Sequence, residues 1–344
     1  MQMHSGTTWR SAENLRSGKP RISIGMPVFN GEKYIREALD SILAQTYQDF
    51  ELIISDNAST DGTRRICLEY AREDSRISYY RNEKNFGASR NFNRVFELSR
   101  GEYFKWAAHD DVHAPEFLEK CVRVLDRDSS VVLCHSKTAR IDEHGTIVGT
   151  YDHKMRTNSL KPHERFRDII NIHSPCWSIF GVMRADSLRM TPLFGNYIGT
   201  DRNILAEISL MGRIYEIPEY LFFRRDHKDA YTRRFYEQGP RSDTHAAERY
   251  QEQAGWWTRT SQLNIANVKN SMEYFRSVRR VPLKWHERLL CYAQINSWFL
   301  REGWMLVGFD MESAFLNRSR FGRKLASVIR WTLRHAMMPT IKKD

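Results

Sequence analysis

The sequence predicts an α/β fold, in which a mostly parallel sheet is flanked by helices and followed by a C-terminal helical region. Strands alternate regularly with helices through the first half of the 344-residue chain, which is typical of a parallel sheet covered on both faces. Two of the predicted strands end at aspartates, at the edge where such sheets bind ligands. From about residue 244 the pattern becomes helical and amphipathic, rich in Trp, Tyr and Arg.

The elements of the first half follow from the spacing of apolar residues. A strand over 21–28 comes first, and the helix after it has an apolar face made of Ile35, Leu39, Ile42 and Leu43. A strand over 50–55 leads to Asp56, and Asp61 then caps a helix that runs to residue 71. The remaining elements are a strand over 77–80, a helix over 88–98, a strand over 103–107, a helix that begins near Pro115 and a strand over 131–135.

The alternation loosens after residue 136. A hairpin turn is expected at 142–145, a helix over 162–172, a strand over 178–183, a helix over 201–211 and a strand over 214–217. We therefore expect a flexible N-terminus over 1–20, a sheet domain over 21–238 and a C-terminal helical region over 239–344. The boundary between the last two should lie near 236–243.

The composition favours a folded protein with phosphate-bearing partners. Hydrophobic residues make up 41% of the chain, enough for a substantial core, and the formal net charge is +11. Such a charge suits nucleic acid, an anionic membrane surface or a phosphorylated small molecule, and does not choose among them. The composition does not determine the oligomeric state, and a homo-oligomer is one of the alternatives.

The cysteines and the N-terminus bear on the compartment. Five cysteines are widely spaced, with no Cys-x-x-Cys pair, which favours a reducing compartment and argues against a structural zinc site. The first 20 residues are polar and basic, unlike a secretory signal, and no stretch approaches the ~20 apolar residues of a membrane span. We expect a cytoplasmic protein, with peripheral contact to the inner face of the membrane left open.

The segment from Ser55 to Thr63 is the first candidate binding motif. Asp56 stands at a strand end, where its carboxylate can accept hydrogen bonds from a uracil or guanine ring or from ribose hydroxyls. The polar turn after it leads to a helix N-terminus, which favours phosphate. Because an N-cap does not require Asp56, ligand contact is the better interpretation for it, whereas Asp61 is better explained as an ordinary N-cap.

Asp110 and Asp111 form the second candidate motif, after the strand over 103–107. Adjacent carboxylates repel each other unless a cation lies near them. Mg²⁺ or Mn²⁺ would relieve that repulsion and bridge to a diphosphate, since hard cations prefer carboxylate and phosphate oxygens. Neighbours in an extended stretch point opposite ways, so Asp110 is the expected ligand and Asp111 the second choice. His109 and His113 are weaker candidates.

Four motifs in this order resemble the inverting glycosyltransferases of the large bacterial family two, which have the GT-A fold. They are the run from Ile24 to Asn30, the segment from Asp56 to Thr63, the run from Asn85 to Asn91 and the Asp110-Asp111 pair, within a resemblance that covers residues 21–229. The resemblance implies a nucleotide-binding sheet, a nucleotide-sugar donor and a Mn²⁺ or Mg²⁺ cofactor. It assigns nucleotide-sugar contacts to Pro27, Val28, Asn30, Asp56, Gly87, Asn91 and Asp110, and the metal to Asp110.

The chain departs from the family pattern at two places. The first Asp of the Asp-x-Asp motif is Ala108 here, and Asp111 could compensate. The Glu-Asp pair before the acceptor helix is Thr200-Asp201 here, so the resemblance makes Asp201 the catalytic base that deprotonates the acceptor hydroxyl. General-base help is worth about 10²–10⁴-fold. The competing interpretation is that Asp201 only caps the helix after it.

The stretch from Leu221 to His227 resembles the family's Tyr-Arg-x-His segment. Arg224 and Arg225 offer guanidinium groups suited to a diphosphate, and His227 could complete the metal site. Asp226 shifts the register, so whether Asp226 or His227 reaches the metal stays open, and a plain basic strand end is the alternative.

The segment 319–343 interleaves basic residues with apolar ones. Such a helix could lie on an anionic membrane, which would suit a lipid-linked acceptor, or it could pack on its own domain or on a partner subunit. The resemblance further implies that the acceptor is a glycan or lipid-linked precursor in polysaccharide biosynthesis.

Two other functions agree with parts of the sequence. A nucleotidyltransferase acting on sugar phosphates also combines a nucleotide-binding sheet with metal-binding carboxylates, but the run from Phe29 to Lys33 is too poor in glycine for its phosphate loop. A non-catalytic nucleic-acid-binding protein would suit the net charge of +11, but the basic residues are spread along the chain rather than grouped in a binding motif. We therefore expect no nucleic-acid partner.

Overall fold

The computed structural model describes residues 8–9, 18–152, 155–171, 176–227 and 266–311. Within these ranges ten strands form one sheet in the order β1-β4-β3-β2-β5-β9-β7-β10-β6, with β8 beside β7. The parallel pairs are β4-β3, β3-β2, β2-β5 and β7-β10, whereas β1, β6, β8 and β9 run antiparallel to their neighbours. The strands are β1 (Thr8–Trp9), β2 (Ile22–Val28), β3 (Phe50–Asp56), β4 (Ile77–Arg81), β5 (Tyr103–Trp106), β6 (Val112–His113), β7 (Val131–Ile141), β8 (Ile147–Tyr151), β9 (Val182–Arg184) and β10 (Arg213–Arg225).

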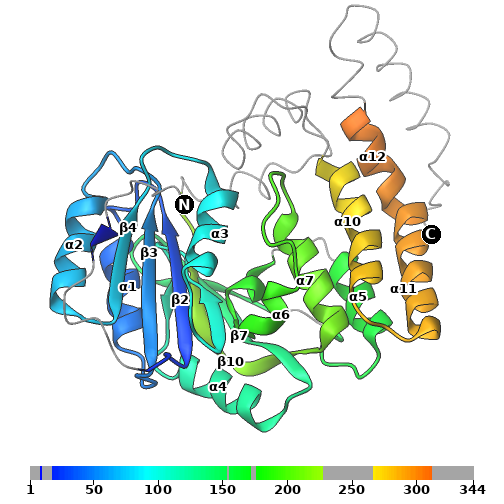
Figure 1. Cartoon of the computed structure of the whole chain (residues 1–344), viewed down its shortest axis with the longest axis horizontal. Coiled ribbons are helices and arrows are strands. Elements are labelled where there is room, and N and C mark those ends of the chain that lie inside the picture. The colour runs from blue at the N-terminus through cyan, green and yellow to red at the C-terminus, as the bar shows by residue number, and fades with distance from the viewer. Residues whose placement is uncertain (1–7, 10–17, 153–154, 172–175, 228–265, 312–344) are drawn as a thin grey trace, which may run out of the picture.

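Helices cover both faces of this sheet (Figure 1). One hydrophobic cluster joins the sheet to α1 (Ile35–Leu43), α2 (Thr63–Glu73) and α4 (Phe117–Arg127). A second cluster joins the other face to α3 (Ala88–Glu97), α5 (Pro162–Ile170), the 3-10 helix η1 (Trp177–Phe180), α6 (Ala185–Arg189) and α7 (Thr200–Met211). The strands alternate between the two clusters with period two: Leu52 and Ile54 face the first and Ile53 the second.

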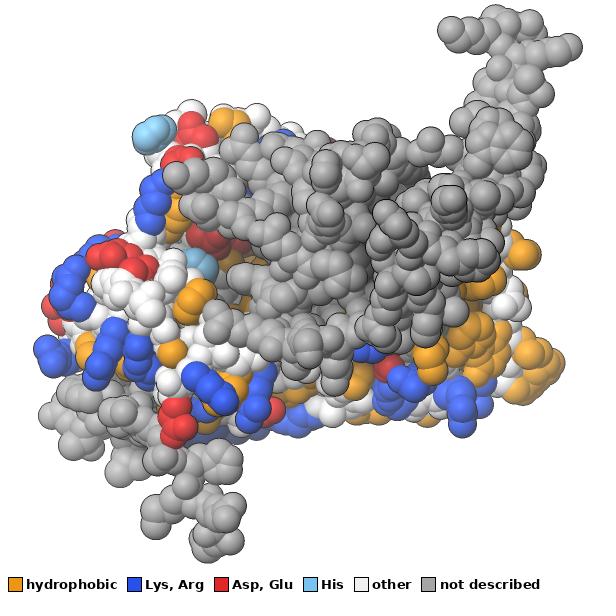
Figure 2. All heavy atoms as spheres, turned by 90° about the horizontal axis from the view of Figure 1, so that it is seen from above, with side chains coloured by type: hydrophobic (Ala, Val, Ile, Leu, Met, Phe, Trp, Pro, Cys, Tyr) orange, Lys and Arg blue, Asp and Glu red, His pale blue; other side chains and the backbone are white. Residues whose placement is uncertain are grey.

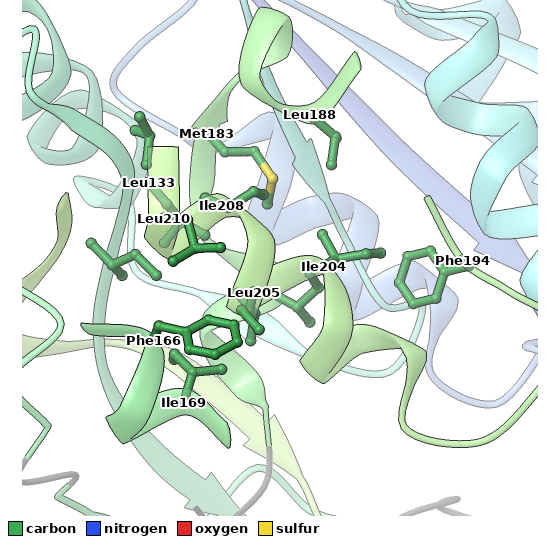
Figure 3. Close-up of a cluster of buried hydrophobic side chains, with 14 of the residues drawn as sticks. Leu133, Phe166, Ile169, Met183, Leu188, Phe194, Ile204, Leu205, Ile208 and Leu210 are labelled. Carbon is green, nitrogen blue, oxygen red and sulfur yellow. The ribbon is translucent and has the colours of Figure 1, made fainter. Parts of the chain in front are cut away.

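The described part of the C-terminal region consists of α10 (Ala266–Arg280), α11 (Trp285–Trp298), the π-helix η2 (Phe299–Gly303) and α12 (Trp304–Met311). These helices pack on α5 and α7 at the right of Figure 1. Tyr274, Val278 and Ile295 belong to the same buried cluster as Ile204 and Ile208 of α7, part of which is drawn in Figure 3. None of the described helices has the length and apolarity that a membrane crossing requires.

The predicted elements of the first half are confirmed to within a few residues, and three regions differ. Strands β7 and β10 are longer than predicted and end at Ile141 and Arg225. They pair in parallel beyond the point where polar residues interrupt the apolar pattern, with a register shift around Pro218. The predicted strand over 178–183 is instead η1 followed by β9. In the N-terminal segment 1–20, which was expected to be flexible, Thr8 and Trp9 pair with β4. The helix expected over 319–343 lies outside the described residues.

Gly25, in the middle of β2, allows α3 to lie against the sheet. A Cβ atom at this position would come within 2.6 Å of Val95 Cγ2 and 2.9 Å of Phe104 Cζ. We expect Gly25→Ala to lower the free energy of unfolding by about 1–3 kcal/mol, the usual cost of overpacking a core. Chemical denaturation measures this as a lower midpoint with an unchanged m-value.

Gly149→Ala is the matched control for this substitution. Gly149 lies in β8, and a Cβ there would have only Arg140 Nη1, at 4.0 Å, near it. Its unfolding midpoint should stay close to that of the unchanged protein. Equal midpoints for the two variants would show that α3 does not pack on β2 this closely.

Candidate active site

The carboxyl ends of β2, β3 and β5 bring the two aspartate motifs to one edge of the sheet. Asp56 ends β3 opposite Val28, the last residue of β2, and β2 also pairs with β5, after which Asp110 follows. Neighbouring strands lie about 4.8 Å apart, so two strand spacings separate the two motifs by roughly 10 Å. In the loop after β2, Gly31 lies against the His109 ring, since a Cβ there would be 2.7 Å from His109 Cδ2.

Asp56 is fully buried, and both its carboxylate oxygens are engaged. Oδ1 accepts the Ser59 amide at 2.8 Å, and Oδ2 accepts the Tyr79 hydroxyl at 2.6 Å as well as the Arg81 guanidinium. The side chain of Arg81 is 24% exposed, so it is the part of this group that reaches the surface. Sequence reasoning missed Arg81, although an arginine at the carboxyl end of β4 was a usable signal.

Asn30 and the residues around α3 hold this corner in shape. Asn30 is exposed with φ of 52°; its side-chain oxygen accepts the Thr60 amide, and its own amide donates to Ser59 Oγ, both at 2.9 Å. Gly87 precedes α3 with φ of 90°. Asn91 is buried, with its amide group donating to Ser55 O at 2.7 Å. Asn30 therefore faces solvent, whereas Asn91 connects α3 to β3 through a buried hydrogen bond. Pro27 and Val28 are buried at the end of β2.

Asp110 meets His227 across the sheet edge. Asp110 Oδ2 and His227 Nε2 are 2.9 Å apart, and the two side chains are 19% and 9% exposed. Burial alone would raise the pKa of Asp110, but His109, His227 and Arg224 together lower it. A carboxylate and an imidazole that already converge can bind a divalent cation, with substrate phosphates completing its coordination. No group of three or more His, Cys, Asp and Glu side chains with metal-binding geometry occurs among the described residues.

Asp111, next to Asp110 in the chain, has a different partner. It is buried, and its Oδ1 accepts the Arg225 amide at 2.9 Å. Burial and the charge of Asp110 raise the pKa of Asp111. Its carboxylate therefore anchors the end of β10 to the loop that carries Asp110.

Arg224 and Arg225 have different surroundings. Arg224 is in electrostatic contact with Asp110 and Asp111, pairs with Asp226 and lies over the Trp177 ring. Asp226 also pairs with Arg140, on the neighbouring strand, so two arginines already engage its carboxylate.

Arg225, by contrast, has no exposed surface. Its guanidinium donates to Asp110 O at 3.0 Å and Asp142 O at 3.1 Å, and pairs with Glu37 at 2.6 Å. It therefore connects the Asp110 loop, the hairpin turn and α1. The phosphate contact predicted for Arg225 is corrected to this positioning role, because the buried guanidinium is already engaged.

Asp201 lies in the first turn of α7, a helix that contacts η1. Gly199, with φ of 84°, occupies the N-cap position, so Asp201 is not the cap residue; its Oδ1 accepts the Arg202 amide at 2.8 Å. Burial raises the pKa of Asp201. Burial and the nearby Asp201 charge raise the pKa of the Cys176 thiol to about 12. Because Trp177 follows Cys176 and contacts Arg224, η1 connects the surroundings of Asp201 with those of Asp110.

The two weaker histidine candidates separate in the structure. His109 stays at the sheet edge beside Gly31. His113 is buried in β6 between Phe117 and Phe222, and burial lowers its pKa well below the usual value. His113 is therefore a core residue.

The chain is similar to known proteins in sequence and in fold. Residues 23–188 match the family model described as Glycosyl transferase family 2. An uncharacterized glycosyltransferase of Methanocaldococcus jannaschii is 31% identical over 158 residues, which cover 45% of this chain and 54% of that protein. One from Rickettsia typhi is 38% identical over 125 residues, which cover 36% and 38%. The chain thus spans about half or less of the length of these relatives.

Two solved structures are similar over most of the chain. A crystal structure of residues 1–349 of S. aureus TarS in complex with UDP-GlcNAc has a TM-score of 0.53 and 15% identity, covering 87% of this chain and 91% of that one. The mannosyltransferase PcManGT from Pyrobaculum calidifontis, in complex with GDP-Man and Mn²⁺, has a TM-score of 0.50 and 15% identity, covering 94% and 83%. At this identity the likeness concerns the fold, and it confirms the predicted α/β architecture of the GT-A type.

Proposed function

We propose that this chain, whose residues 23–188 match the model of glycosyltransferase family 2, transfers a sugar from a nucleotide-sugar donor to a hydroxyl group of a glycan or lipid-linked acceptor. The transfer would depend on a divalent cation and would invert the anomeric carbon. The observation that carries this proposal is the Asp110–His227 pair, 2.9 Å apart at the sheet edge that also holds Asp56 and Arg81. UDP-GlcNAc in TarS and GDP-Man with Mn²⁺ in PcManGT support a nucleotide-sugar donor and a metal.

The nucleoside would lie at the carboxyl ends of β2, β3 and β4. Asp56 holds the Arg81 guanidinium in place, and Arg81 and Asn30 present their polar groups to the base and ribose. Gly87 and Asn91 keep the start of α3 close to this corner. In this arrangement Asp56 acts on the nucleoside chiefly through Arg81, since its own oxygens are taken.

The diphosphate would lie between Arg224 and the Asp110–His227 pair. Asp110 and His227 would hold Mn²⁺ or Mg²⁺, which when bound neutralises negative charge on a diphosphate leaving group. Arg224 adds a guanidinium on the same side, where a buried charge interacts more strongly than in water. Arg225 and Asp111 keep the Asp110 loop at a fixed distance from β10.

Asp201 would accept the proton of the acceptor hydroxyl. In a single displacement, a bond forms between the acceptor oxygen and the anomeric carbon, the bond from that carbon to the diphosphate oxygen breaks, and the proton moves to the Asp201 carboxylate. Attack opposite to the leaving group inverts the configuration. Burial raises the pKa of Asp201, which makes its carboxylate a stronger base than an exposed aspartate.

A thermal-shift experiment with UDP, GDP, UDP-sugars and GDP-sugars tests the proposal, each with Mn²⁺, with Mg²⁺ or with EDTA. A ligand at 100 times its Kd stabilises the native state by about 2.7 kcal/mol, which raises Tm by several degrees. We expect one nucleotide class to raise Tm with a divalent ion and to lose this effect in EDTA. The acceptor assay should then release nucleoside diphosphate.

Three results would count against the proposal. If no nucleotide raises Tm, the proposed nucleotide-binding site is wrong. If Tm rises equally in EDTA, the proposed role of a divalent cation in nucleotide binding is wrong. Release of pyrophosphate from a nucleoside triphosphate and a sugar phosphate would instead identify a nucleotidyltransferase. Inversion is checked separately from the anomeric configuration of the product.

A further inference from the structure

The C-terminal helices concentrate the exposed apolar side chains of the protein. Nine of the thirteen large hydrophobic residues that are exposed within the described ranges lie between residues 266 and 311. Figure 2 shows hydrophobic side chains gathered at the right end of the molecule, over these helices, with Lys and Arg beside them. We call this surface the helical patch; its members are Met272, Phe275, Trp285, Leu289, Leu290, Phe299, Leu300, Met305 and Leu306.

The spacing along α11 explains why these residues remain exposed. Cys291, Ile295 and Trp298 form its buried side, packed against α5 and α10. Trp285 and Leu289 are one turn apart on the opposite side, and Leu300, in η2, continues the same row. They are 74%, 58% and 76% exposed. This row of α11 is thus an apolar face without a partner within the described part of the chain.

The charges around the helical patch are of one sign. Between residues 266 and 311 every exposed charged residue is basic, namely Arg276, Arg279, Arg280, Lys284 and Arg301. The four acidic residues of this region are buried or half-buried, and Glu273 is covered by Arg276 and Arg280. Trp285 follows Lys284 directly, at the tip between α10 and α11, so an aromatic ring and basic groups project together.

From these observations we infer that the helical patch binds the surface of an anionic lipid bilayer, with the apolar row in the interface and Arg279, Lys284 and Arg301 at the headgroups. Apolar residues flanked by Lys and Arg, with Trp at the boundary, are the composition of interfacial helices. A second copy of this chain fits less well, because an isologous contact would bring two equally basic rims together.

The rest of the sequence agrees with this partner. The 33 residues after Met311 contain eight Lys and Arg against two Asp and Glu. The inference rests on the proposed function only in that a lipid-linked acceptor would give bilayer binding a purpose. Binding itself needs no nucleotide, so vesicle binding and nucleotide binding can fail independently.

The test is sedimentation of the full-length chain with vesicles of phosphatidylcholine and phosphatidylglycerol, compared with vesicles of phosphatidylcholine alone. We expect binding to the anionic vesicles that weakens as salt rises, since exposed charges are screened. The double variant L289E/L300E should bind at least roughly tenfold more weakly, because two apolar side chains are lost and two negative charges are gained. The segment after Met311 is unchanged in this variant.

Leu160→Glu is the matched control. Leu160 is 81% exposed and lies outside the helical patch, so this variant should bind vesicles like the unchanged protein. Circular dichroism melting and nucleotide thermal shifts should be the same for all three proteins, because the substituted residues are exposed. Sedimentation equilibrium of each protein without lipid follows its oligomeric state.

The inference is overturned if L289E/L300E binds anionic vesicles as tightly as the unchanged protein, or if none of the proteins binds them. It is also overturned if the unchanged chain is a dimer that the double variant dissociates, while vesicle binding is absent. Equal loss in the double variant and in Leu160→Glu would show an effect of net charge alone.

Discussion

Replacing Asp201 with Asn is expected to lower kcat about 10²–10⁴-fold, the contribution of a general base, while the KM for the nucleotide sugar changes little. The amide keeps the size and the hydrogen bond to the Arg202 amide but cannot take the acceptor proton. Steady-state kinetics with the donor found by thermal shift, together with the melting temperature, measures this. The fall in kcat/KM at acidic pH should also disappear in the variant, because in the unchanged protein the base is lost by protonation below the raised pKa of Asp201.

Asp186→Asn is the control for this result. Asp186 also lies in the first turn of a helix, α6, and its side chain is 94% exposed and pairs with Arg189. Its kinetics should match those of the unchanged enzyme. Normal turnover in Asp201→Asn at saturating donor and acceptor would remove Asp201 as the base.

Asp110→Asn is expected to lower kcat/KM at least about a hundredfold, since a divalent ion at the leaving group contributes several kcal/mol. Because the substitution removes the carboxylate that faces His227, the variant should also lose the metal-dependent part of the nucleotide thermal shift. His227→Gln should give a smaller loss of the same kind, since Asp110 remains. Titration of Mn²⁺ in the thermal-shift assay measures the affinity directly.

Asp49→Asn provides the comparison for Asp110→Asn. Asp49 is exposed and precedes β3, at the opposite edge of the sheet, so neither metal dependence nor turnover should change. If Asp110→Asn keeps a Mn²⁺-dependent shift equal to that of the unchanged protein, the cation does not lie at this pair.

The sequence was sufficient for the central sheet and for the placement of its two aspartate motifs. Each of β2, β3 and β5 is a short apolar run that ends in polar residues, so their order along the chain predicted that Asp56 and Asp110 share an edge. The same logic located α7 and placed Asp201 at its start. These features depend on local patterns, which a single sequence displays.

The remaining features depend on contacts between distant segments. Arg225 contacts Asp110 and Asp142, which precede it in the chain by 115 and 83 positions. No local pattern distinguishes its buried guanidinium from that of Arg224. The engagement of Asp56 by Tyr79 and Arg81 likewise requires the pairing of β3 with β4. The later part of β7 is largely polar, and in β10 Pro218 and Glu219 interrupt the apolar pattern before Leu221 and Phe222. These parts are strands because they pair with each other, so periodicity did not predict them.

Helix α7 carries Asp201 in its first turn and Glu207 two turns later. Glu207 is buried, accepts the Ser277 hydroxyl at 2.9 Å and pairs with Arg280, both from α10. Truncating Arg280 while α10 stays packed on α7 would leave that carboxylate without its cation in the interior, at a cost of about 3–5 kcal/mol. These contacts hold the two helices in a fixed relative position, so a shift of α10 would also move the helix whose first turn contains Asp201.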